Sequence, residues 1–84
     1  MVENVNNPET AIEFALGQPG AVTIEVYNLL GLKVRVLEGR FAAGKGELVW
    51  DGKDSSGRPA ASGVYFYKLV SEGTHQVRRM LLLK

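Results

Sequence analysis

The stretch from Trp50 to Tyr67, WDGKDSSGRPAASGVYFY, most constrains how this chain can fold. It begins with the only tryptophan, continues through two turn signals at Asp51-Gly52 and residues 54–57, and ends in an aromatic strand pattern. A buried tryptophan removes roughly 150–250 Å² from water, which is worth roughly 4–6 kcal/mol at about 25 cal/mol per Å². A small core supplies only about 3–5 kcal/mol net. We therefore expect the core to form around Trp50.

Length and charge limit the chain to a small group of protein classes. Its 84 residues suffice for one domain, which we expect at residues 10–84 after a lead-in at residues 1–9. A net charge of +1 argues against nucleic-acid or membrane-surface partners, and there is no cysteine for disulfides or thiolate ligands. Residues 1–4 lack the features of a signal peptide. We expect either a cytosolic protein or, preferably, an excised domain with an added Met1.

Apolar and polar residues alternate along most of the chain, as in half-buried strands. Residues 39–46 are expected to form a loop, with Phe41 folding back over an edge of the core. Turn residues bound the segments at the spacing typical of an all-β sandwich or barrel. The predicted strands are 10–16, 21–28, 33–38, 46–50, 64–70 and 75–84.

The alternation also predicts which side chains face inward. In the third segment, Val34 and Val36 are expected inside, with Lys33 and Arg35 outside. Gly31 occupies the left-handed position of a type I turn with a bulge. The predicted core is Ile12, Phe14, Val22, Ile24, Val26, Val34, Leu48, Trp50, Tyr65, Tyr67 and Met80.

The residue types needed for catalysis are scarce. His75 is the only histidine, and no nucleophile–base set, metal-ligand spacing or phosphate-binding glycine loop accompanies it. We therefore predict no enzyme, no catalytic residue, no cofactor and no small-molecule substrate.

The residues around Asp51 do not match a calcium-binding loop of the EF-hand type. An EF-hand needs an oxygen ligand at position 3 and glycine at position 6, where this chain has Lys53 and Ser56. Asp51 and Asp54, with Gly52, are instead expected to hold turns through Asx hydrogen bonds. No metal site is predicted.

The last strand is apolar on both faces near its end. Met80 and Leu82 are expected to face the core, which leaves Leu81 and Leu83 on the opposite face. These two leucines suit a partner surface or the pairing of a strand edge with another chain. The alternative is that a neighbouring loop carrying Phe41 covers them.

The order of motifs, from Asn7-Pro8 through W-D-G-K-D and A-S-G-V-Y to M-L-L-L-K, resembles the C-terminal sorting domains of type IX secretion. Those domains share their fold with the Ig-like domain of the flagellar hook-capping protein. The resemblance covers about residues 7–84 and implies an immunoglobulin/fibronectin-like antiparallel β-sandwich of six or seven short strands. The lead-in is shorter than usual in the family, and Gly46 stands where histidine is common. The positions it marks are Asn7, Pro8, Gly31, Gly63, Tyr65 and Lys84.

The resemblance implies a non-catalytic sorting and anchoring domain of a secreted or cell-surface bacterial protein. Its partner is then a protein, the type IX export or surface-attachment machinery, and its location is the cell exterior after passage through the periplasm. The residues expected to be recognised are Gly63, Tyr65, Leu81, Leu83 and Lys84. Two alternatives stay open: a structural Ig-like spacer or assembly module of the hook-capping type, and a carbohydrate-binding module that uses exposed aromatic residues.

Overall fold

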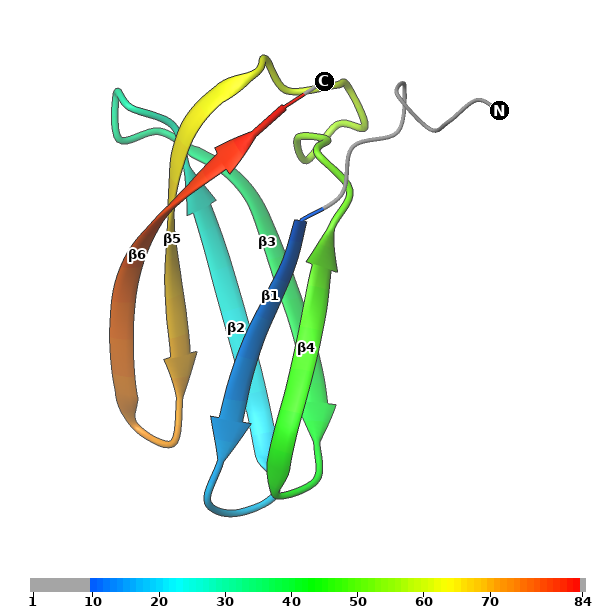
Figure 1. Ribbon diagram of the computed structural model, residues 1–84, viewed down its shortest axis with the longest axis vertical. Helices are drawn as coiled ribbons and strands as arrows, with labels where there is room; N and C mark the ends of the chain where they lie inside the picture. The colour runs from blue at the N-terminus through cyan, green and yellow to red at the C-terminus, as the bar shows by residue number, and fades with distance from the viewer. Residues whose placement is uncertain (1–9, 84) are drawn as a thin grey trace.

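The computed structural model describes residues 10–83, which form six β-strands (Figure 1). Within that range there is no helix, and so none long and apolar enough to cross a membrane. The predicted all-β class is confirmed. The strands are β1 (Thr10–Leu16), β2 (Gly20–Tyr27), β3 (Lys33–Phe41), β4 (Gly44–Trp50), β5 (Gly63–Ser71) and β6 (Thr74–Leu82).

The strands form two antiparallel sheets of unequal size. The larger sheet has the order β3-β2-β5-β6, and the smaller sheet consists of β1 and β4. Figure 1 shows the β1–β4 pair lying across the β2–β3 side of the larger sheet, with the β5–β6 hairpin to one side of it. The architecture is therefore the predicted antiparallel β-sandwich, with six strands.

The core lies between the two sheets and around Trp50, which is fully buried. Every residue predicted for the core is either buried or packed against the buried cluster. The buried apolar side chains are Ile12, Phe14, Leu16, Val22, Ile24, Val26, Trp50, Ala60, Tyr65 and Leu82. Ala60 was not expected, because it lies in the long connection between β4 and β5.

The loop predicted for residues 39–46 is wrong. β3 continues to Phe41 and β4 begins at Gly44, so residues 42–43 alone connect them. The rings of Phe14 and Phe41 meet edge to face, with centroids 4.8 Å apart. A Cβ atom on Gly39 or Gly46 would come within 2.8 Å of one of these rings. Both glycines are therefore strand residues that make room for phenylalanine side chains.

A bulge in β3 makes the predicted orientation of two of its side chains wrong. Val26 pairs with Arg35 and Tyr27 pairs with Lys33, so Val34 is the extra residue. Because the bulge shifts the alternation, Val36 is 39% exposed and does not face inward as predicted. Arg35 lies opposite the buried Val26, on the inner face, and not outside as expected.

Candidate interaction surface

Trp50 fixes the long connection between β4 and β5, residues 51–62. Its indole Nε1 donates a hydrogen bond of 2.9 Å to the Lys53 carbonyl, which satisfies the polar atom of an otherwise apolar ring. The Tyr65 ring packs edge to face on Trp50, with centroids 5.2 Å apart. The connection is thus tied to the core at both of its ends.

Asp51 and Asp54 hold the turns of this connection, through the hydrogen bonds that the sequence predicted. Asp51 Oδ1 accepts the Lys53 N–H at 3.0 Å, while Asp54 Oδ1 accepts the N–H groups of Ser56 and Arg58 at 2.9 and 3.0 Å. Gly52 has a φ of +78°, which favours glycine. Residues 10–83 contain no group of three or more potential metal-ligating side chains.

The same connection covers the outer edge of β3. Arg35 reaches from β3 to Asp51 Oδ1 at 2.9 Å and to the Lys53 carbonyl at 3.0 Å. The Ser55 N–H donates to the Val34 carbonyl at 3.0 Å, and the Ser55 hydroxyl donates to the same oxygen at 3.2 Å. The carbonyl of the bulged Val34 is therefore already bonded and is not free to pair with another strand.

Two carboxylates have lowered pKa values for local reasons. The hydroxyl of Ser56, which donates to Asp54 at 2.8 Å, lowers the pKa of Asp54 below its ordinary value, with further help from the Arg58 and Ser56 N–H groups. The Tyr27 hydroxyl donates to Glu25 at 2.6 Å, which lowers the pKa of Glu25 and raises that of Tyr27. Both carboxylates support local structure.

Gly63 and Tyr65 lie in the framework of the fold. Tyr65 is only 7% exposed, and its hydroxyl donates to the Ala61 carbonyl at 2.6 Å, like the tyrosine corner of immunoglobulin folds. Gly63 has a φ of +149°, a conformation that side chains rarely adopt. Because Tyr65 is buried, it belongs to the core, as the alternation predicted.

Leu81 and Leu83 are exposed, at 55% and 69% of their surface, whereas Leu82 between them is buried. This alternation agrees with the predicted orientation of the last strand. Phe41 does not cover these leucines, because it packs on Phe14. The other predicted positions Asn7, Pro8 and Lys84 lie outside the described residues.

A second exposed apolar group lies in the β2–β3 turn and was not predicted as a surface feature. Gly31 has a φ of +82° there, as expected, and the Gly31 N–H donates to the Asn28 carbonyl at 3.0 Å. Turn tips are normally polar, yet Leu30 is 84% exposed, and Leu29 and Leu32 are also exposed. The sequence signal was present: N-L-L-G-L places three leucines in a turn.

These apolar groups gather at one end of the larger sheet. Tyr27, the last residue of β2, pairs with Phe66, and the next outward-facing residue of β5, Val64, pairs with Leu81. The half-buried Tyr27, Val64 and Phe66 therefore continue the surface between the leucine turn and Leu81. Contiguous apolar groups of this kind are typical of protein-binding surfaces.

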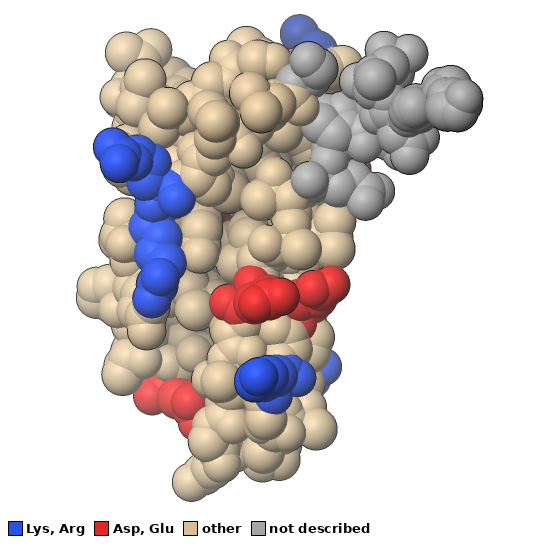
Figure 2. All heavy atoms as spheres, viewed as in Figure 1, with Lys and Arg blue, Asp and Glu red and all other residues tan. Residues whose placement is uncertain are grey.

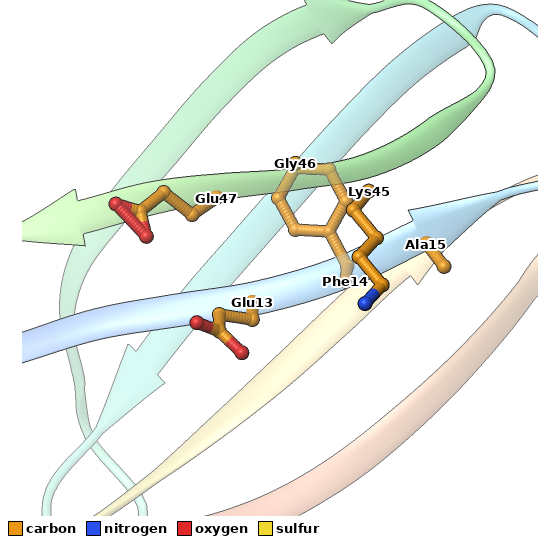
Figure 3. A pocket seen from close by; sticks show the side chains of 6 residues that line it. All are labelled: Glu13, Phe14, Ala15, Lys45, Gly46 and Glu47. Carbon is orange, nitrogen blue, oxygen red and sulfur yellow. The ribbon is translucent and has the colours of Figure 1, made fainter.

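A shallow hollow on the smaller sheet is the other notable surface feature (Figure 3). It has a volume of about 570 Å³ and lies over β1 and β4. Glu13 and Glu47 face each other across the two strands, and the Phe14 ring lies beside Gly46. The hollow is open to solvent and brings together no nucleophile and base, so its geometry suggests no chemistry. Its other lining residues are Ala15 and Lys45.

The fold and these surfaces define an immunoglobulin-like β-sandwich. A model of the FlgD Ig-like domain family matches residues 5–75. The chain therefore belongs to the FlgD Ig-like domain family. The matched range ends near the start of β6, so most of that strand lies beyond it. No curated protein matches the chain.

Two solved structures of FlgD proteins are similar to this chain. FlgD from P. aeruginosa is 28% identical with a TM-score of 0.66, and the match covers 89% of this chain and 60% of that one. FlgD from Xanthomonas campestris, whose structure is described in terms of the hook capping essential for flagellar assembly, is 24% identical with a TM-score of 0.68 and coverages of 90% and 55%. This chain thus spans less than two thirds of either. Neither structure nor the family model is a type IX sorting domain, so the hook-capping side of the resemblance is the one supported.

Proposed function

We propose that the chain is a non-catalytic Ig-like assembly module of the hook-capping type. The observation that carries this proposal is the match of residues 5–75 to the FlgD Ig-like family. The exposed leucines at one end of the sheet are consistent with a module that contacts other proteins. On this proposal the partners are proteins of a flagellar or related surface assembly.

Domain replacement tests the assembly role. In a flagellated bacterium, the Ig-like region of its own FlgD is replaced by this chain, and hook formation and swimming are measured. We expect hooks to form. A matched replacement by an unrelated Ig-like sandwich of similar size separates specific contacts from a spacer role, since a spacer would work equally well. Cells without hooks, despite normal amounts of the chimeric protein, would contradict the proposal.

A second candidate function is the sorting role suggested by the sequence, with a location at the cell exterior. The observation in its favour is that Leu81, in β6, and Leu83, just after it, are exposed and lie beyond the range of the family match. The test fuses a reporter to the chain in a host with type IX secretion. Export should occur and should fall in the double variant Leu81→Ser, Leu83→Ser.

A matched control distinguishes recognition from general loss of apolar surface. Leu29→Ser with Leu30→Ser removes two leucines of the β2–β3 turn that are more exposed, as a pair, than Leu81 and Leu83. On the sorting hypothesis this control is exported normally. If the intact chain never exports the reporter, the sorting role is wrong and the assembly role stands alone.

A further inference from the structure

β6 is an open edge of the larger sheet. It is the outermost strand, and no strand among residues 10–83 pairs with its outer side. Its nine residues pair with β5 without a register shift, and none of them is proline. Natural sheets usually protect an edge of this length with a bulge, a proline, a covering loop or charged side chains. Within residues 10–83, β6 has only the charges of Arg78 and Arg79, which a strand of opposite charge would neutralise. β6 is therefore a suitable template for another strand.

The hairpin geometry identifies the free backbone groups. Glu72 and Gly73 form a two-residue turn with φ values of +52° and +76°, and Ser71 pairs with Thr74 beside it. In such a hairpin the closing pair exchanges both hydrogen bonds, and every second pair along the ladder does the same. The backbone groups between these pairs point away from β5. They belong to His75, Val77, Arg79 and Leu81.

The side chains of β6 indicate the chemistry of a partner. Arg78 and Arg79 are exposed on opposite faces of the strand, and neither makes an ion pair with a carboxylate of the described residues. β6 itself contains no Asp or Glu. Figure 2 shows a band of basic side chains over the side of the molecule where β6 runs, away from the acidic patch over β1 and β4. Val77 and Leu81 flank Arg79 with exposed apolar groups.

We propose that the free edge of β6 binds an extended acidic segment of a partner protein by strand addition. The partner's backbone pairs with the four residues whose backbone groups point away from β5. Its carboxylates lie beside the two arginines, and its apolar side chains contact Val77 and Leu81. A second copy of this chain fits less well, because pairing β6 with β6 gathers four arginines and no carboxylate. The inference goes beyond the proposed function, since it assumes neither a flagellar nor a secretion partner.

The probe is a labelled peptide, acetyl-Thr-Val-Thr-Glu-Glu-Val-Thr-Thr-amide, compared with the same peptide carrying lysine for glutamate. Its two adjacent glutamates point to opposite faces of the added strand, and its valines share a face with one of them. The ¹⁵N-labelled chain is titrated with each. The acidic peptide should bind at least about tenfold more tightly, and its affinity should fall as salt rises. The Val77, Arg79 and Leu81 amides should exchange more slowly when it is bound, with little change at Gln76 and Arg78. Equal binding of both peptides, or no binding of either, overturns the proposal.

Two variants test the mechanism directly. Val77→Pro removes an N–H that does not pair with β5, so the chain should stay folded and lose peptide binding by at least about tenfold. Arg79→Glu should weaken binding of the acidic peptide and strengthen binding of the lysine peptide. Unchanged binding by a folded Val77→Pro chain overturns strand addition.

Modified peptides keep the test decisive if the proline variant does not fold. Two acidic peptides then replace the proline variant, one N-methylated at the odd-numbered backbone amides and the other at the even-numbered ones. Because only every second amide of an added strand donates to β6, one of the two peptides must lose binding. If the unmodified chain dimerises and binds neither peptide, the proposal of an acidic partner is wrong, and the β6 edge binds a second copy of the chain. Because these measurements use the purified chain alone, their failure is distinct from failure of the domain replacement.

Discussion

The two edges of the larger sheet, β3 and β6, differ in how they meet solvent. β3 has a bulge at Val34, and the connection between β4 and β5 covers it through Ser55 and Arg35. β6 has an uninterrupted register with β5 and exposes most of its side chains. One edge is covered by the chain itself, whereas no strand of residues 10–83 pairs with the outer side of the other.

The difference depends on where the chain places its single tryptophan. Trp50 ends β4 in the smaller sheet and holds the following connection against β3 through the Lys53 carbonyl, which also accepts a bond from Arg35. No comparable anchored loop among residues 10–83 lies beside β6, which follows a two-residue turn. Mutations in the core should therefore disturb the cover over β3, whereas substitutions on β6 should change the free energy of unfolding little.

The largest effect is expected from Trp50→Ala. Removing a fully buried indole leaves a cavity and frees the connection that covers β3, at a cost of about 3–5 kcal/mol in the free energy of unfolding. Chemical denaturation measures this loss. Val49→Ala on the exposed side of the same strand is the control, with an expected change within about 0.5 kcal/mol. A Trp50→Ala chain as stable as the control would show that the ring does not anchor the core.

A smaller effect is expected from Arg35→Ala, which removes two hydrogen bonds that join β3 to the connection. Because both partners are partly exposed, solvent screening limits the loss to about 1 kcal/mol. The matched variant on the open edge, Arg79→Ala, should change stability by less than about 0.5 kcal/mol. Equal losses at the two edges would contradict the comparison between them.

A double-mutant cycle tests whether Arg35 acts through Asp51. The losses for Arg35→Ala and Asp51→Ala should not add, because each removes the same 2.9 Å contact. Additive losses would mean that Arg35 stabilises the fold through the Lys53 carbonyl alone.

Sequence patterns predicted most of the fold, because period-two alternation is a strong signal in strands with one buried face. They failed at β3 for two physical reasons. The bulge at Val34 shifts the alternation, so Val36 and Arg35 exchanged their expected faces. Gly39 and Gly46 resembled loop residues, although Gly39 makes room for the ring of Phe41 in its own strand and Gly46 for the ring of Phe14 in β1.

The surface was predicted less completely than the fold. The exposure of Leu81 and Leu83 and the burial of Tyr65 followed from alternation, whereas the contact between the Tyr65 and Trp50 rings did not. The sequence suggested edge pairing as one use of Leu81 and Leu83, but it could not show that β6 is an edge strand, since the order of strands in a sheet is a long-range property. The sequence contained the leucine turn, but turn signals predict where the chain reverses and not what the turn contacts.

The turn next to β6 provides a further test, with a smaller expected change in stability. Glu72 adopts a positive φ of +52° and its carboxylate accepts the N–H groups of Gly17 and Gln18 at 3.1 and 3.2 Å. Glu72→Ala keeps the strained backbone and loses both bonds, so stability should fall by about 0.5 kcal/mol. Glu72→Gly loses the bonds but relieves the strain, and should be about 1 kcal/mol more stable than the alanine variant. Thermal melting of the two variants measures this difference, and the reverse order would contradict it.

The smallest expected effect is that low pH weakens the contact between β3 and the connection that covers it. The pKa of Asp54 is lowered in the folded chain, so its contribution to stability is complete above the unfolded-state pKa, about 3.9, and is lost as the pH falls through the lower folded-state value. Protonation weakens the Asp54 turn and so loosens the neighbouring Ser55 N–H, which bonds Val34.

Hydrogen exchange measured from pH 5 downward tests this coupling. The Ser55 amide should lose protection in acid, after correction for the intrinsic exchange rate, while the amides of Gln76 and Arg78, which pair with β5 in the open-edge strand, should show no matching change. Asp54→Asn removes the titrating group and should make the protection of Ser55 independent of pH in this range. Acid-induced loss that persists in Asp54→Asn would show that another group controls the edge. Loss of equal size at β6 would show that acid loosens the whole sheet, and that the two edges do not respond separately.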